Sequence, residues 1–211
     1  MVKQGQFITF EGGEGAGKST QIKMLVEHLK EKMILTHLTR EPGGCDMAEK
    51  IRDLLVKGSV DTLDELSELL LFSAARHEHV RQKIRPLLDK NYCVISDRFY
   101  LSTYVYQSFA GGLDFDFVEM VTKKAIEGAE PNLTILLDID PKVGLVRSMD
   151  NEITHDEKRF EGKDIKFHEK VRQGFLDAAK TSENIIVIDG SQDLEKVHQD
   201  IINELEKRDL I

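Results

Sequence analysis

The pattern Gly12-x-x-x-x-Gly17-Lys18-Ser19 constrains the fold of this chain more than any other feature. It directly follows an apolar, β-prone run, Phe7–Phe10, and precedes a segment with helical spacing, Gln21–Lys32. Glycines let the backbone turn so that successive N–H groups converge on an anion, and a following helix N-terminus adds partial positive charge. A strand, this loop and a helix in that order predict a site for a nucleoside triphosphate.

The polar side chains of this loop have expected roles toward the triphosphate. Lys18 would contact the β- and γ-phosphates, Ser19 would ligate Mg²⁺, and Thr20 offers a further hydroxyl. Contacts to ATP are expected from the whole loop: Gly12, Gly13, Glu14, Gly15, Ala16, Gly17, Lys18, Ser19 and Thr20. Glu14 is unexpected, because it places a carboxylate where a polyanion should bind.

Strand and helix patterns alternate along the 211 residues, which favours one α/β domain, 1–211, with a parallel sheet covered on both faces. Short apolar runs predict five strands at Phe7–Phe10, Ile34–Leu38, Tyr92–Ser96, Leu133–Ile139 and Ile185–Ile188. Helical spacing predicts helices at Gln21–Lys32, Ala48–Val56, Leu63–Lys83, Phe115–Glu127, Ile165–Lys180 and Leu194–Leu205.

The net charge, the cysteines and the apolar runs indicate which partners and which cellular compartment to expect. The formal net charge of −9 would repel a long polyanion, so nucleic acid is not expected as a partner. Cys45 and Cys93 form no metal-binding spacing and suit a reducing compartment. The sequence has no apolar run of membrane-spanning length. A cytoplasmic protein without a membrane partner is therefore expected.

Several polar groups should meet at the carboxyl edge of the sheet, where α/β proteins bind ligands. Asp97 and Arg98 follow the third predicted strand: the carboxylate would hold Mg²⁺, and the guanidinium would bridge donor and acceptor phosphates. The alternative is that these two residues form only a strand-terminal ion pair or turn cap. Arg40 and Glu41, after the second strand, are read either as site residues or as ordinary loop charges.

The segment ELLLFSAARHEHV predicts a helix with a possible base-binding face. Phe72 and Arg76 are four residues apart, so a planar base would stack on the ring while the guanidinium donates to its edge. The alternative is that Phe72 belongs to the core. His77 and His79 point about 200° apart on a helix and cannot easily share a metal ion. They are interpreted as solvated or base-adjacent side chains.

Among nucleotide-binding classes, a small-molecule kinase fits best. The late strands end in LLDIDPKVG and VIDGSQDL, neither of which matches the NKxD-like segment of guanine-specific proteins. Motor and assembly ATPases usually have longer chains. A nucleotide kinase, a deoxynucleoside kinase and a non-catalytic ATP-binding regulator remain open at this point.

Five segments together resemble the thymidylate kinase family of nucleoside monophosphate kinases, nearly end to end: FEGGEGAGKST, TREPGG, LLLFSAARHEHV, SDRFYLSTYVYQ and RFEGKDIKFHEKVRQGF. The resemblance implies transfer of the γ-phosphoryl of ATP to dTMP in dTTP synthesis, with Mg²⁺, in a homodimer. It also implies a three-layer P-loop NTPase fold, with a five-stranded parallel sheet and a short mobile lid at about 147–163.

The resemblance also implies a role for individual residues. Phe72 would stack on thymine, Arg76 would bond a ring carbonyl, Tyr106 would crowd the sugar, and Glu41 would help order metal or water. The remaining acceptor-binding residues would be Arg52 and Arg98 at the phosphate and Thr103 and Gln107 at the base.

The implied catalytic residues are Lys18, Arg98, Arg159 and Glu14. Glu14 would face the sugar 3′-hydroxyl or a metal-bound water, and the missing positive charge would come from the lid. Between positions 147 and 159 the lid has few cations, of which Arg159 best matches a lid arginine of the family and Arg147 is second, on the ATP side.

Overall fold

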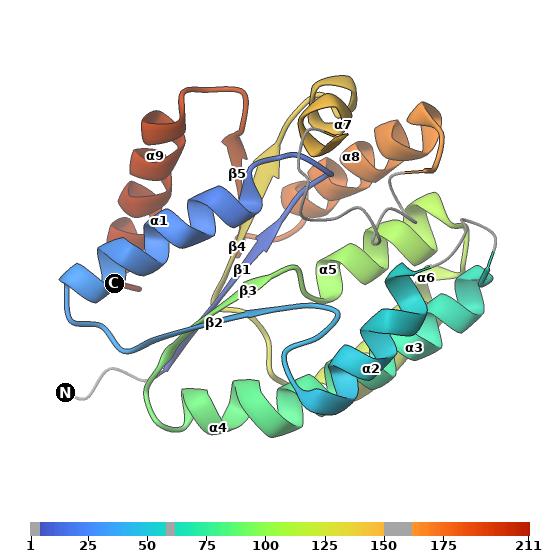
Figure 1. The fold of residues 1–211 in the computed structure, drawn as a ribbon, viewed down its shortest axis with the longest axis horizontal. Helices are drawn as coiled ribbons and strands as arrows, with labels where there is room; N and C mark the ends of the chain where they lie inside the picture. Colours follow the sequence, from blue (N-terminus) through green and yellow to red (C-terminus); the bar gives the residue numbers. More distant parts are fainter. Residues whose placement is uncertain (1–4, 58–61, 150–161) are drawn as a thin grey trace.

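The computed structural model describes residues 5–57, 62–149 and 162–211. Among these residues, five parallel strands form a single sheet in the order β2-β3-β1-β4-β5 (Figure 1). The strands are β1 Gln6–Glu11, β2 Thr36–Arg40, β3 Cys93–Asp97, β4 Leu133–Asp138 and β5 Ile185–Asp189. All five predicted strands are therefore confirmed, with small shifts at their ends.

Helices cover both faces of the sheet, as the alternating pattern predicts (Figure 1). Two of them, α1 Lys18–Glu31 and α9 Leu194–Lys207, lie on one face. The other face is covered by elements that include α3 Glu65–His79, α6 Phe115–Ile126 and α8 Ile165–Lys180. The remaining helices are α2 Asp46–Val56, α4 Arg85–Leu88, α5 Tyr100–Thr103 and α7 Pro141–Met149.

Successive residues of the central strands pack into opposite layers. On β1, Ile8 and Phe10 join the cluster beneath α1 and α9, whereas Phe7 packs with Val94 and Phe99 on the other side. This follows from the period of two along a strand, and it explains why the sequence of a strand buried on both faces is almost continuously apolar. The two clusters fix the sheet between its helices and bring the carboxyl ends of the strands to one edge.

The structure differs from the predicted helices in three places. The predicted helix Leu63–Lys83 is α3, which continues as a π-helical stretch, Val80–Ile84, before α4. The sequence pattern did not indicate α5 with its π-helical continuation Tyr104–Ala110, because this segment does not keep the 3.6-residue period. It also did not indicate α7, a short helix that begins at a proline, a residue favoured at the first helical position.

Part of the predicted lid, 147–163, lies outside the described residues, which include 147–149 and 162–163 of it. Arg159 also lies outside them. Over the described ranges, no helix is long and apolar enough to cross a membrane.

Candidate active site

The phosphate-binding loop lies between the end of β1 and the start of α1, as predicted. Helix α1 begins at Lys18, directly after Gly17, so its N-terminus opens toward the loop. The Lys18 Nζ donates to the carbonyls of Gly12 and Gly13 at 3.1 and 3.0 Å. Burial and the nearby Arg98 lower the pKa of Lys18, although neighbouring carboxylates oppose the shift. The lysine is thus held inside the loop by the loop's own backbone.

The phosphate-binding loop packs tightly against the start of α7. Gly15 has a φ of +63°, a region that side chains disfavour, and a Cβ there would overlap the backbone of Gly144. A glycine is therefore required at position 15 by both conformation and space. Because Gly144 belongs to α7, the helix that leads toward residue 150, the loop and that helix are in direct contact.

Ser19 and Asp97 come together at the start of α1 and the end of β3. The Ser19 Oγ donates to Asp97 Oδ2 at 3.2 Å. A hydroxyl and a carboxylate are hard oxygen ligands of the kind Mg²⁺ uses in nucleotide sites, where substrate phosphates and water complete its coordination. The two predicted metal-binding side chains therefore fit the ion that the sequence analysis assigns to them.

Arg98 links the phosphate-binding loop to the helical segment after β3. Its backbone is left-handed, with φ 66°, and its Nη1 donates to Gly12 O at 3.0 Å and to Ser102 Oγ at 3.1 Å. Its Nη2 donates to Glu14 Oε1 at 2.8 Å. The guanidinium also lies over the Tyr106 ring, 5.4 Å from the centroid. These bonds leave Nε and one hydrogen of Nη2 for another acceptor.

Glu14 is paired rather than exposed as an isolated negative charge. In addition to Arg98, its Oε1 accepts a hydrogen bond from the Tyr106 hydroxyl at 3.1 Å. Burial alone would raise the pKa of Glu14, but the charges of Arg98 and Lys18 outweigh it, so that the pKa lies below its usual value. The carboxylate in the loop is therefore kept ionised by the cations around it.

Glu11, at the end of β1, is a site residue that the sequence analysis did not select. It is fully buried: Oε1 accepts from the backbone N–H of Phe99 at 2.9 Å and of Ser102 at 3.2 Å, and Oε2 accepts from Ser102 Oγ at 2.6 Å. Burial raises the pKa of Glu11 despite the opposing charge of Arg98. An acid that ends an apolar strand run was the only signal for it in the sequence.

Arg76, on α3, lines the same region of the structure as Thr103 and Glu41 and is buried, with 2% of its surface exposed. Its Nε donates to Glu41 Oε2 at 2.7 Å, Nη1 to Thr103 Oγ1 at 2.9 Å, and Nη2 to Phe99 O at 3.3 Å. The carboxylate of Glu41 also lies 2.9 Å from His79. Three predicted substrate-binding residues, from α3, α5 and the loop after β2, are thus joined in one network.

Gln107 and Arg52 are each held in one orientation. The amide nitrogen of Gln107 donates to Glu68 Oε2 at 2.8 Å, which leaves the carbonyl oxygen as a hydrogen-bond acceptor. Arg52 Nη1 donates to Pro42 O at 2.8 Å. Arg40 forms a surface ion pair with Glu49 at 3.1 Å. The two neighbouring charged residues Arg40 and Glu41 therefore differ: the side chain of Arg40 is half exposed, whereas Glu41 is buried.

One continuous cleft, with a volume of about 990 Å³, contains most of the predicted site residues. It extends from the phosphate-binding loop to residues of α3 and the segment after β3. Its lining includes Glu14, Gly15, Ala16, Gly17, Lys18, Ser19, Thr20, Glu41, Arg52, Phe72, Arg76, Asp97, Arg98, Thr103, Tyr106, Gln107 and Arg147. Phe72 is half-buried and faces this space, so it is not a fully buried core residue. Residues far apart in the sequence therefore meet in a single space.

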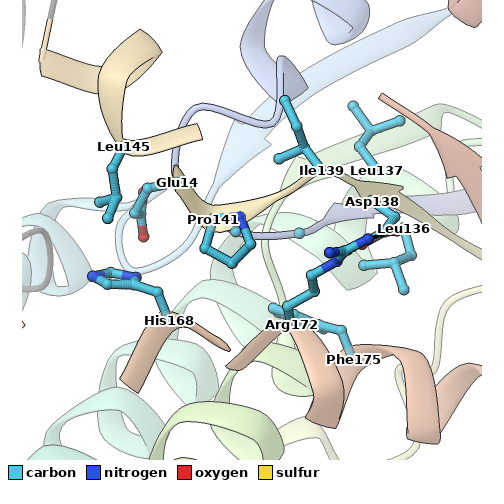
Figure 2. A pocket seen from close by; sticks show the side chains of 12 residues that line it. Glu14, Leu136, Leu137, Asp138, Ile139, Pro141, Leu145, His168, Arg172 and Phe175 are labelled. Atoms are coloured by element: carbon cyan, nitrogen blue, oxygen red, sulfur yellow. Dashed lines mark hydrogen bonds and ion pairs between the residues drawn. The ribbon is translucent and has the colours of Figure 1, made fainter. Parts of the chain in front are cut away.

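A second, small cavity of about 20 Å³ lies behind the phosphate-binding loop (Figure 2). Gly12 and Gly13 line this space and do not line the large cleft. Figure 2 shows His168 of α8 beside Glu14, and Arg172, which donates to both oxygens of Asp138 at 2.7 and 2.8 Å. The cavity has room for about one water molecule. Residues of α8 therefore lie against the phosphate-binding loop and bond to the end of β4.

Comparison with known proteins reveals similarity over nearly the whole chain. Residues 10–201 match the family model described as "Thymidylate kinase". A thymidylate kinase from Magnetococcus marinus is 47% identical over 97% of both chains, and one from Sulfurihydrogenibium sp. is 39% identical over 98% of this chain and 100% of its own. The crystal structure of thymidylate kinase from Ehrlichia chaffeensis has a TM-score of 0.77 at 35% identity, covering 97% of this chain and 99% of that one.

Proposed function

The chain belongs to the thymidylate kinase family, and on that premise we propose that it transfers the γ-phosphoryl group of ATP to dTMP, giving ADP and dTDP. The observation that carries the proposal is the single cleft, which joins the phosphate-binding loop to a second set of arginines and an aromatic ring. A phosphoryl donor and an acceptor nucleotide need to share one space of this kind, because the transfer is direct.

On the donor side, ATP binds with its phosphates in the loop from Gly12 to Thr20. Lys18 contacts the β- and γ-phosphates, and Ser19 and Asp97 hold Mg²⁺, as their 3.2 Å contact supports. When bound, Mg²⁺ neutralises charge on the phosphate oxygens. Arg147, whose Nη1 donates to Gly190 O at 3.3 Å at the rim of the same cleft, lies on the ATP side.

On the acceptor side, the thymine base lies against Phe72. Arg76 donates to a ring carbonyl from the hydrogens that its own network leaves free, and the Gln107 carbonyl accepts the ring N–H. Thr103, which already accepts from Arg76, also contacts the base. A donor and an acceptor side by side match the edge of thymine, and this complementarity supports dTMP as the substrate.

The sugar and phosphate of dTMP lie between the base site and the loop. Tyr106, fixed by its bond to Glu14, crowds the 2′ position, and Glu14 faces the 3′-hydroxyl or a metal-bound water. Arg52 and Arg98 bind the 5′-phosphate. Glu41, whose two oxygens contact Arg76 and His79, acts mainly by orienting Arg76.

Catalysis depends on positioning and charge rather than on covalent chemistry. Lys18 and Arg98 are in place around the reacting phosphates, while Glu14 holds Arg98. Arg159, from the proposed lid at 147–163, adds positive charge to the transferring group. Closure of that lid excludes water, which would otherwise compete with dTMP as the acceptor.

The active form is a homodimer of this single 1–211 domain. Helix α3 contacts both α2 and α6, and these three helices carry exposed apolar side chains: Leu54, Leu66, Leu70, Phe115 and Met120. An apolar surface of this kind supports contact with a second copy of the chain.

The buried, unpaired Cys45 and Cys93 support a reducing compartment, the cytoplasm.

A coupled assay of ADP release tests the proposed activity. ATP is supplied with dTMP, dUMP, dCMP, dGMP or thymidine, and a reaction without acceptor is run beside them. The proposal expects ADP release only with an acceptor, and fastest with dTMP. Phosphorylation of thymidine but not dTMP would contradict it, and binding of ATP with no acceptor-dependent ADP release would indicate a nucleotide-binding regulator instead.

A further inference from the structure

A fully buried histidine that the proposed chemistry does not use lies directly behind the acceptor side. His79 is the last residue of α3 and has no exposed surface. Its Nδ1 is 2.9 Å from Glu41 Oε1, and its Nε2 is 2.7 Å from Thr39 Oγ1. The interpretation of His79 as a solvated residue is therefore wrong: it is buried, and its ring nitrogens bond to Thr39 near the end of β2 and to Glu41 just after it.

The partners define the direction of both bonds. An ionised carboxylate only accepts hydrogen bonds, so Nδ1 donates to Glu41. Nε2 is then available to accept the hydroxyl proton of Thr39. The imidazole thus holds Thr39, near the end of β2, and Glu41, just after the strand, at a fixed spacing, one at each ring nitrogen.

The loop after β2 wraps closely around this ring. Gly44 has a φ of +85°, and a Cβ at this position would overlap both the His79 imidazole and the Thr39 hydroxyl. The glycine is required here because the backbone passes against the ring. His79 is thus a fixed support around which the segment from Thr39 to Gly44 is folded.

The histidine is connected through Glu41 to the arginine that contacts the base. Glu41 Oε1 faces His79, and Glu41 Oε2 accepts from Arg76 Nε at 2.7 Å. All three side chains are buried, with exposed fractions of 0%, 3% and 2% for His79, Glu41 and Arg76. Without the His79 donor, one oxygen of this buried carboxylate lacks its partner, so Glu41 and the guanidinium bound to its other oxygen lose the orientation that the network fixes.

We propose that His79 is a positioning residue for the acceptor nucleotide: by holding Glu41, it orients Arg76 toward the base. This inference rests on the proposed function, in which Arg76 binds the base of dTMP. The same loop contributes Pro42, whose carbonyl accepts from Arg52, so support from His79 extends to the arginine proposed for the acceptor phosphate. His79 itself touches neither substrate.

If His79 positions Arg76, its replacement should weaken the binding of dTMP and leave the binding of ATP unchanged. His79→Leu removes the donor to Glu41 but keeps an apolar side chain of similar size. Since a hydrogen bond to a buried charge is lost, the Kd and KM for dTMP should rise by about tenfold to a hundredfold. The Kd for ATP, measured without dTMP, should stay within about twofold of wild type, because the ATP site shares no residue with this network.

Two conservative variants keep the test informative if His79→Leu does not fold. His79→Asn places an amide donor near the position of Nδ1 and should restore most of the affinity for dTMP. Thr39→Val removes only the hydroxyl partner of Nε2 and should weaken dTMP binding less than His79→Leu does. His77→Leu is the matched control: His77 lies two residues away on α3 and contacts the carbonyl of Ala125, away from the cleft. It should bind dTMP as the wild type does.

A double-mutant cycle separates positioning from a general loss of stability. If His79 acts through Arg76, then His79→Leu should weaken dTMP binding strongly in the wild type but little in an Arg76→Lys background. Equal effects in both backgrounds, or unchanged dTMP binding in folded His79→Leu, would overturn the proposal. Wild-type protein that fails to phosphorylate dTMP would contradict the proposed function instead, so the two failures are distinguishable.

Discussion

Replacement of Glu11 by glutamine should lower activity, and the stability of the variant relative to wild type should rise with pH. The buried carboxylate accepts from two backbone N–H groups and from the Ser102 hydroxyl, which in turn accepts from Arg98. Glutamine has nearly the same shape, and its carbonyl oxygen can keep both backbone bonds. The introduced amide nitrogen, however, donates to Ser102 Oγ instead of accepting from it. Ser102 Oγ then accepts from both Arg98 and the introduced amide. The hydroxyl proton of Ser102 no longer has the Glu11 carboxylate as its acceptor.

The size of the effect follows from the bonds that change. One hydrogen bond to a charged group is lost, which is worth about 1.5–3 kcal/mol. If that loss falls on the orientation of Arg98 in the transition state, kcat/KM should decrease by about tenfold to a hundredfold. Loss of the Glu11 charge near Arg98 acts in the same direction, because the guanidinium then has fewer counter-charges around it.

The contribution of Glu11 to wild-type stability should depend on pH in the opposite sense to that of an ordinary ion-paired carboxylate. Burial raises the pKa of Glu11 above its usual 4.5, so the folded state binds this proton more tightly than the unfolded state does. The stability that this adds is fully present below pH 4.5 and is lost as pH rises through the raised pKa. Glutamine has no such titration, so Glu11→Gln should gain stability relative to wild type as the pH rises.

Thermal unfolding across pH and steady-state kinetics with ATP and dTMP check both parts. Glu127→Gln is the control: its carboxylate also pairs with an arginine, Arg85 at 2.8 Å, but outside the cleft. It should leave kcat/KM unchanged. A Glu11→Gln protein whose stability relative to wild type does not rise with pH, with activity lost only in proportion to the unfolded fraction, would refute the reasoning. In that case Glu11 would hold the fold together and have no separate effect on Arg98.

Three further changes test the two substrate sites and the lid. Asp97→Asn should raise the Mg²⁺ concentration needed for half-maximal activity, measured by Mg²⁺ titration at saturating nucleotides, because one charged ligand is lost. Phe72→Leu should weaken dTMP binding by about tenfold through loss of stacking, with ATP binding unchanged in calorimetry. Arg159→Ala should lower kcat far more than it weakens ATP binding. Full activity in that variant would remove Arg159 from the catalytic set.

The strands of the sheet could be predicted from the sequence because a buried strand contains a recognisable run of apolar residues. Strands β1 and β4 are buried at nearly every position, and most of their buried side chains are apolar, since both faces are covered by helices. The phosphate-binding loop could also be predicted, because the glycines and Lys18 that form it lie close together in the sequence. Features that depend on neighbours in sequence were therefore predictable.

The residues that were missed depend on contacts between distant segments. Glu11 and Ser102 are 91 positions apart, and Glu41 and His79 are 38 apart. Nothing in the local pattern of HEH distinguishes a solvated histidine from one buried against another loop. The segment Tyr104–Ala110 was missed for a different reason: its π-helical turns break the period on which helix prediction relies.

The negative charge of Glu14 in a phosphate-binding loop is explained by its pairing with Arg98. The two side chains form a 2.8 Å ion pair, and the pKa of Glu14 is held down, so the pair as a whole contributes almost no net charge. Arg98 is thereby fixed in position, but it offsets little of the charge of two bound phosphates. That charge must be balanced by groups outside the pair: Lys18, Arg52, the metal ion and a further cation. An arginine from 147–163 is the expected source, which makes Arg159→Ala the most direct test of the charge balance.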